Sequence, residues 1–67
     1  MNNIFITLCD GVKVFRVNVN HIVAYYDERT GTLCHGIVNL DNDTTLYVKE
    51  SAATIDEIIY AALNSKN

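Results

Sequence analysis

One stretch near the C-terminus restricts the fold more than any other part of the chain. Residues 46–51, Leu-Tyr-Val-Lys-Glu-Ser, are typical of a last strand, and an apolar stripe at helical spacing follows them. The apolar positions of this stripe are Ile55, Ile58, Ile59, Ala62 and Leu63. A helix of about a dozen residues is marginal alone in water. We therefore predict a single helix, over about residues 52–64, that is held in place by packing on a β-sheet.

The start of this helix has two possible N-caps. Ser51 stands immediately before the predicted helix, and Ser is a favoured capping residue. Thr54 and Glu57 have the spacing of a capping box, in which each side chain satisfies a free backbone N–H of the first turn. The sequence leaves both starts open.

The rest of the chain has the patterns of β-strands. Apolar residues alternate with polar or mixed ones, or β-branched and aromatic residues gather in short runs. The predicted strands cover about residues 4–9, 12–17, 22–27, 32–40 and 44–49. We expect a single small domain over residues 1–67, of the α+β class. Its antiparallel sheet would have about five strands, with the C-terminal helix packed on one face.

Three short segments predict how these strands are connected, and one glycine indicates an irregular position inside a strand. Asp10-Gly11 favours a two-residue type I′ hairpin turn, because such turns need a positive φ that Gly adopts without strain. Residues 18–20, Asn-Val-Asn, predict one turn or a short 3₁₀ helix. Residues 27–31 are polar and end in Gly, which is typical of a hairpin loop. Gly36 lies inside a predicted strand and indicates a bulge or a close backbone approach.

Composition and charge exclude several classes of protein. Hydrophobic residues make up 49% of the 67 residues and the net charge is −3, so the chain should fold but lacks the basic surface expected of a nucleic-acid-binding protein. No apolar run approaches the ~20 residues of a membrane span, and the N-terminal residues have no signal-peptide pattern. We expect a cytoplasmic protein that does not insert into membranes and does not bind nucleic acid. So short a chain buries little surface, which favours self-association.

Residues suited to metal binding or catalysis are present but poorly arranged. Cys9, Cys34, His21 and His35 lack the paired spacing of zinc ligands, and adjacent strand residues point to opposite faces. The two cysteines are expected to be reduced thiols buried in strands. We therefore expect no metal site, no cofactor and no catalytic residues, and a protein that is not an enzyme.

The best candidates for contact with a partner are aromatic. Tyr25 and Tyr26 are adjacent on a predicted strand, so one of them should face outward, and Tyr47 should also face outward. Arg29 lies in the predicted hairpin loop. Tyr and Arg are enriched at protein interfaces. An alternative interpretation of each tyrosine is an ordinary cross-strand packing contact on the solvent side of the sheet.

The order of these elements resembles the FlbD/SwrD family of small flagellar motility proteins. The resemblance covers most of the chain, and its sharpest part is residues 48–51, Val-Lys-Glu-Ser, leading into a helix. It implies a short, cytosolic, non-enzymatic protein connected with flagellar motor function.

Two functional hypotheses follow from the sequence. The first is a non-catalytic protein-interaction or regulatory module that self-associates and has a role in motility. The alternative is a small inhibitor of the kind that phages and mobile elements encode, which blocks a host enzyme or sequesters a small ligand.

Overall fold

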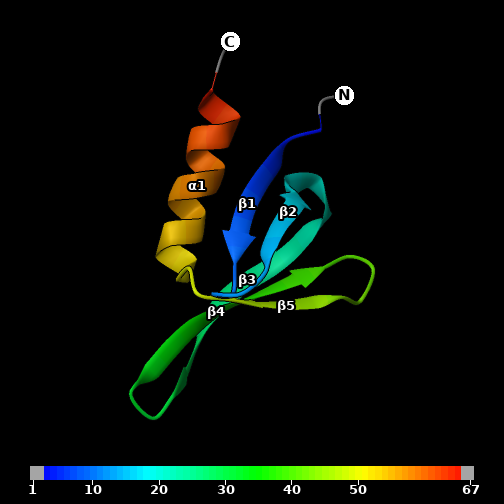
Figure 1. The fold of residues 1–67 in the computed structure, drawn as a ribbon. Helices are drawn as coiled ribbons and strands as arrows, with labels where there is room; N and C mark the ends of the chain where they lie inside the picture. Colours follow the sequence, from blue (N-terminus) through cyan, green and yellow to red (C-terminus); the bar gives the residue numbers. More distant parts are fainter. Residues whose placement is uncertain (1–2, 66–67) are drawn as a thin grey trace.

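The computed structural model describes residues 3–65 and shows an α+β fold with one C-terminal helix (Figure 1). Strands β1 (Phe5–Cys9) and β2 (Val14–Asn18) form one antiparallel sheet. A short 3₁₀ helix, η1 (Val19–His21), leads to the second sheet. That sheet contains β3 (Ile22–Thr30), β4 (Leu33–Leu40) and β5 (Thr45–Val48), and α1 (Ala52–Asn64) follows. The predicted fold class is confirmed.

The two sheets meet where β5 leads into the helix. The backbone N–H of Lys49 donates to the carbonyl of Cys9 at 2.8 Å, and the N–H of Cys9 donates to the Glu50 carboxylate at 3.1 Å. At the opposite end of β1, the N–H of Val19 donates to the carbonyl of Ile4 at 2.8 Å. The five strands therefore form two sheets, of two and three strands, that curve around one core.

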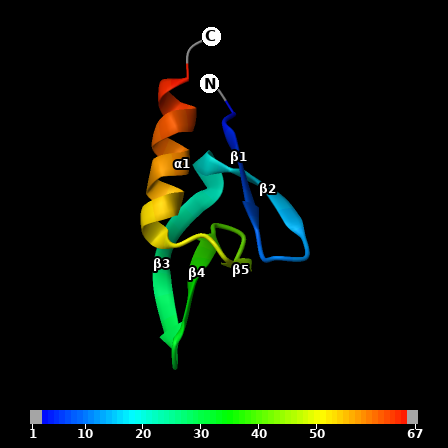
Figure 2. The ribbon, with the colours of Figure 1, turned by 60° about the vertical axis from the view of Figure 1, so that its left-hand side comes forward.

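The core lies between the two sheets and α1, which contacts both β1 and β3 (Figure 2). Its buried side chains are Ile6, Leu8, Val17, Val38, Val48 and Ile55. Ile55 is fully buried, whereas Ile58 and Ile59 are partly buried at the margin of the core. Apolar burial of this kind contributes about 1.5–3 kcal/mol for each large side chain, so the helix stabilises the fold chiefly through its first two turns.

The helix begins at the first of the two predicted starts. The hydroxyl of Ser51 accepts a hydrogen bond from the N–H of Thr54 at 3.2 Å, which makes Ser51 the N-cap. A second acceptor comes from the sheet, since the carboxylate of Asp27 accepts the N–H of Ala52 at 2.7 Å. Thr54 therefore lies inside the first turn, and the capping box at Thr54 and Glu57 does not start the helix.

The predicted type I′ turn at Asp10-Gly11 is wrong. Strand β2 begins at Val14, so residues 10–13 form the connection. The Asp10 carboxylate accepts the N–H groups of Val12 at 2.8 Å and of Lys13 at 2.6 Å, and Gly11 has a φ of 98°. These two hydrogen bonds hold the pKa of Asp10 below its usual value. The Asp10 carboxylate accepts these N–H groups in place of a backbone carbonyl, and this stabilises a loop longer than the predicted two-residue turn. The prediction of a 3₁₀ turn after Asn18 is confirmed by η1.

The hairpin loop predicted over residues 27–31 is also wrong. Strand β3 continues to Thr30, which pairs with Leu33, and only Gly31 and Thr32 form the turn. Gly31 has a φ of 63°, as expected at the first central position of a type II′ turn. Residues of the predicted loop therefore belong to a protruding two-stranded ribbon, which we call the β3–β4 arm and define as residues 27–36.

Gly36 marks a close backbone approach, one of the two features predicted for it. A Cβ atom at this position would lie 2.3 Å from the carbonyl oxygen of Glu50. The irregularity in strand pairing lies elsewhere, in β3 between Ile22 and Ala24. Gly36 thus allows the connection between β5 and α1 to cross directly over β4.

Candidate interaction surfaces

The three-stranded sheet has an inner face toward α1 and an outer face away from it. Tyr25 pairs with Val38 in β4, and Val38 is part of the core, so these residues lie on the inner face. Tyr26 pairs with Ile37, and Ile37 in turn pairs with Tyr47 on β5, so these three residues form a row on the outer face. The sheet therefore sends the two adjacent tyrosines to different surfaces.

The outer-face row, Tyr26, Ile37 and Tyr47, is the first candidate surface. Tyr26 is 48% exposed and Tyr47 is 58% exposed, whereas Ile37 between them is only 2% exposed. The imidazole of His35 lies beside Tyr47, with ring centroids 6.2 Å apart. The row is thus a small apolar cluster separate from the core, with two aromatic rings available for contact.

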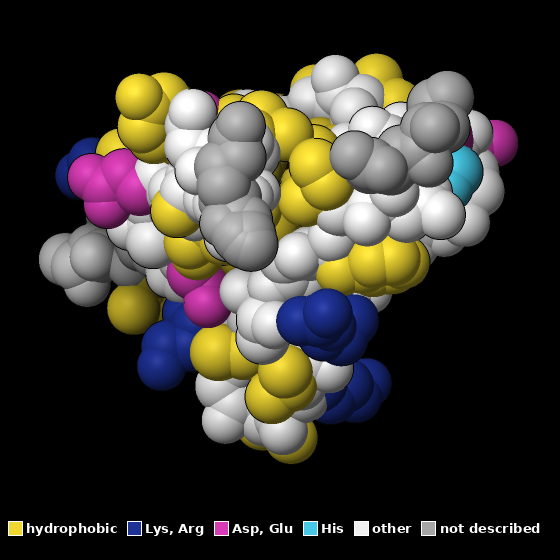
Figure 3. Space-filling view, turned by 90° about the horizontal axis from the view of Figure 1, so that it is seen from above, with side chains coloured by type: hydrophobic (Ala, Val, Ile, Leu, Met, Phe, Trp, Pro, Cys, Tyr) yellow, Lys and Arg dark blue, Asp and Glu magenta, His cyan; other side chains and the backbone are white. Residues whose placement is uncertain are grey.

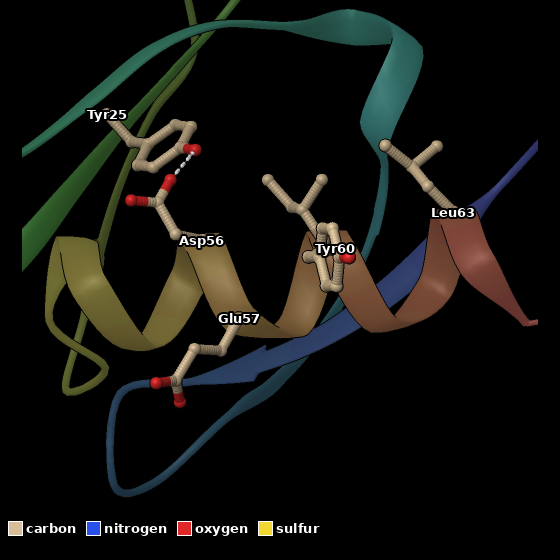
Figure 4. Close-up of a pocket in the computed structure, with 6 residues that line it drawn as sticks. Tyr25, Asp56, Glu57, Tyr60 and Leu63 are labelled. Atoms are coloured by element: carbon tan, nitrogen blue, oxygen red, sulfur yellow. Dashed lines mark hydrogen bonds between the residues drawn. The ribbon is translucent and has the colours of Figure 1, made fainter.

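The second candidate is a groove between β3 and α1 with a volume of about 510 Å³ (Figure 4). We call it the β3–α1 groove, and its lining residues are Tyr25, Asp56, Glu57, Ile59, Tyr60 and Leu63. Most of the lining surface is apolar, while two carboxylates lie on its helical side. Tyr60 and Leu63 are 70% and 54% exposed. The groove can therefore accept an apolar or aromatic group that has no negative charge.

A hydrogen bond joins the two walls of this groove. The hydroxyl of Tyr25 donates to the carboxylate of Asp56, as the dashed line in Figure 4 shows. This hydrogen bond, partial burial and the charge of Asp56 all raise the pKa of Tyr25 above 10.0. Because the pKa of Tyr25 is higher in the folded state than in the unfolded state, the contact with Asp56 stabilises the folded state at pH values below the unfolded pKa. That contribution is lost as the pH rises through the folded pKa.

The third candidate is the β3–β4 arm, which extends away from α1 and from the β1–β2 hairpin (Figure 2). Strand β5 pairs only with residues 36–39 of β4, so most of the arm has two strands. Arg29 pairs with Cys34 on this arm, and both are exposed. Arg29 lies on the same strand as Tyr25 and Tyr26, but beyond the part of the sheet that β5 supports.

The four residues predicted to bind a partner do not form one site. Tyr26 and Tyr47 come together on the outer face, Tyr25 lies in the groove, and Arg29 lies on the arm. The sequence reasoning missed the helical wall of the groove. A usable signal was present, because Tyr60 lies off the apolar stripe of the helix and close to Leu63 in sequence.

Apolar side chains are exposed over much of the remaining surface. Figure 3 shows groups of hydrophobic side chains on the face seen from above, where α1 finishes, with Lys and Arg side chains beside some of them. The large hydrophobic side chains that are exposed within residues 3–65 are Phe5, Val12, Val14, Val23, Tyr26, Leu33, Tyr47, Tyr60 and Leu63. The guanidinium of Arg16 lies 5.8 Å from the centre of the Phe5 ring and shields part of it.

Residues of the metal-ligand types come together at most in pairs in the described part of the chain. Within residues 3–65, no group of three or more His, Cys, Asp or Glu residues could hold a metal ion. His21 pairs with Asp41 at 2.8 Å, and both cysteines are free. Cys34 is exposed, so the prediction that both thiols are buried is wrong: Cys34 lies on the two-stranded arm, where nothing packs over it.

Within residues 3–65, no helix has both the length and the apolar character needed to cross a membrane. No family model matches the chain, and searches of curated proteins and of solved structures also found no match.

Proposed function

We propose that this protein is a non-catalytic interaction module that associates with copies of itself. One observation carries the proposal: within residues 3–65 only seven hydrophobic side chains are buried, while nine large ones are exposed, in a chain that is 49% hydrophobic. Monomeric proteins rarely expose contiguous apolar patches larger than roughly a few hundred Å². Small domains with limited cores commonly gain stability by oligomerisation.

The exposed groups are of the kind found at protein interfaces. Tyr26 and Tyr47 present aromatic rings beside a buried isoleucine, and aromatic residues are enriched at interfaces. Tyr60 and Leu63 add an apolar surface on the helix. Association through any of these surfaces would remove apolar area from water, which supports a role in binding rather than in chemistry.

Light scattering coupled to size-exclusion chromatography tests self-association. The monomer has a mass of 7.5 kDa, and we expect a multiple of this mass that declines as the sample is diluted. A mass of one chain at every concentration would refute self-association.

We further propose that the module acts in the cytoplasm and has a role in motility. The two free cysteines agree with a reducing compartment. The resemblance to the FlbD/SwrD family, centred on residues 48–51, supports the link to the flagellar motor. Deletion of the gene in a flagellated host should reduce spreading in soft agar, and re-expression should restore it. Unchanged spreading would contradict the motility role without affecting self-association.

The β3–α1 groove favours a second candidate function, the sequestering of a small ligand by an inhibitor protein. Its volume of about 510 Å³ is typical of small-ligand sites, which range over about 300–1,000 Å³. Asp56 and Glu57 disfavour phosphate groups, so the ligand would be a neutral or cationic aromatic molecule. Such compounds should raise the melting temperature of the wild type but not of Tyr60→Ala. Equal stabilisation of both proteins would show that the compounds do not bind in the β3–α1 groove.

A further inference from the structure

Strand β3 lies at the edge of its sheet, and its backbone edge that faces away from β4 is open. Within residues 3–65 its only sheet neighbour is β4, and its residues from Tyr26 to Thr30 are all exposed. In an antiparallel hairpin closed by a two-residue turn, the residues that flank the turn form a hydrogen-bonded pair, and the two kinds of pair then alternate. Thr30 flanks the turn, so Asp27 and Arg29 direct their backbone N–H and C=O groups away from β4.

The arm needs support that its own sheet does not provide. A two-stranded ribbon is marginally stable in water, and β5 supports only the base of this one. An exposed row of backbone donors and acceptors is also a template for pairing with another strand. The outer edge of β3 is therefore the part of the molecule best suited to adding a strand.

We propose that β3 pairs antiparallel with β3 of a second copy, with Glu28 of one copy opposite Glu28 of the other. This inference rests on the proposed self-association and specifies its surface. The pairing is isologous, so it closes as a dimer and does not extend into a fibre. It joins two three-stranded sheets into one sheet of six strands, with the outer faces of both copies on the same side.

Charge selects this register. With Glu28 on the symmetry axis, Asp27 of each copy lies opposite Arg29 of the other. A shift by two residues in either direction places Asp27 opposite Asp27, or Arg29 opposite Arg29. One oxygen of Asp27 already accepts the N–H of Ala52, and a carboxylate has further acceptor sites for a guanidinium. Exposed ion pairs contribute little affinity, so backbone hydrogen bonds hold the dimer and the charges set its register.

The two Glu28 side chains oppose this pairing. Like charges directly opposite each other destabilise a cross-strand pair. Replacing Glu28 by Thr removes the repulsion and adds a residue with a high strand propensity. Glu28→Thr should therefore lower the dimer dissociation constant, an effect that an interface elsewhere on the molecule would not produce.

Charge reversal gives the decisive experiment. Arg29→Asp makes both positions negative and Asp27→Arg makes both positive, so each variant alone should form less dimer than the wild type at the same concentration. An equimolar mixture should form a heterodimer, because every Asp then faces an Arg. The double variant Asp27→Arg/Arg29→Asp should dimerise again. Far-UV circular dichroism checks that each variant folds, because the Asp27 carboxylate also accepts a hydrogen bond from the N–H of Ala52 at the start of the helix.

A cross-linking measurement avoids changes to Asp27. In a background with Cys9→Ala and Cys34→Ser, Glu28→Cys should oxidise rapidly to a disulfide-linked dimer, because the two residues face each other. Lys13→Cys, on the exposed turn of the other hairpin, should not.

Two results distinguish failure of the β3 pairing from failure of self-association as a whole. A wild type that dimerises while Arg29→Asp dimerises equally well, with no cross-link at position 28, would overturn the β3 pairing and leave self-association intact. A wild type that is monomeric at every concentration would overturn both.

Discussion

Substitution of Gly36 by Ala tests the close approach between β4 and the connection that leads from β5 to α1. The added Cβ would lie 2.3 Å from the carbonyl oxygen of Glu50, 3.2 Å from a methyl group of Val48 and 3.4 Å from a methyl group of Ile55. A side chain can rotate away from a new methyl group, but a backbone carbonyl cannot. The connection between β5 and α1 must therefore move by about 1 Å to reach an ordinary contact distance of about 3.4 Å.

The movement is costly because two hydrogen bonds join this connection to Cys9 of β1. Lys49 donates its N–H to the carbonyl of Cys9, and the Glu50 carboxylate accepts the N–H of Cys9. Overpacking typically costs about 1–3 kcal/mol, and weakening one of these hydrogen bonds adds about 0.5–1.5 kcal/mol. We expect Gly36→Ala to lower the free energy of unfolding by about 2–4 kcal/mol. For a domain of this size, each kcal/mol corresponds to about 4–8 °C in Tm.

Urea denaturation followed by circular dichroism measures this loss. Both proteins are compared at one concentration, because self-association makes apparent stability depend on concentration. Gly31→Asn is the matched control: nothing lies within 4 Å of a Cβ at Gly31, and Asn tolerates its positive φ. A Gly36→Ala protein within about 0.5 kcal/mol of the wild type, the usual range for neutral surface changes, would refute the steric reasoning.

Three further predictions concern the helix. Ile55→Ala removes a fully buried side chain and should cost about 2–5 kcal/mol in urea denaturation. Ser51→Ala should cost about 0.5–2 kcal/mol as the loss of an N-cap, and Thr54→Ala should cost less; the reverse order would contradict the helix start described above. Asp56→Asn should lower the pKa of Tyr25 in an absorbance titration of the tyrosines. In the wild type, the stability supplied by this pair should persist below pH 10.0 and fall as the pH rises through the raised pKa, and a wild type that titrates like the variant would contradict the contact.

The parts of the fold that the sequence predicted well depend on periodic burial. The helix was predicted over residues 52–64, and α1 has those bounds. Tyr47 was predicted to face outward, and its side chain is 58% exposed. Each of these predictions depends on which side of an element is apolar, and that information is local to the element.

The turns and the division into sheets were predicted less well because they depend on particular hydrogen bonds, some within a turn and some between elements. At Asp10-Gly11 the flanking residues would suit a tight turn, but the Asp10 carboxylate accepts two backbone N–H groups and stabilises a longer loop. The division of the strands into two sheets likewise depends on where Lys49 meets Cys9. Neither contact is visible in residue patterns.

The candidate surfaces illustrate the same limit. Strand geometry alone predicted that Tyr25 and Tyr26 point in opposite directions, but the position of α1 decides which of them faces outward. Asp56 on that helix hydrogen-bonds Tyr25, which leaves Tyr26 on the outer face. The burial of Ile37 on the same outer face could not be foreseen, because it depends on the alignment of three strands.

The arm shows why an exposed edge strand is easily mistaken for a loop. Residues 27–30 are polar and charged because both faces of the arm and one backbone edge meet water, whereas a central strand would be apolar. Charged side chains on an edge strand also prevent indiscriminate pairing with other chains. In β3 the charges are ordered so that a second copy can match them in one register, with Asp27 opposite Arg29. The polar character that hides this strand in the sequence is therefore the property that would make its pairing selective.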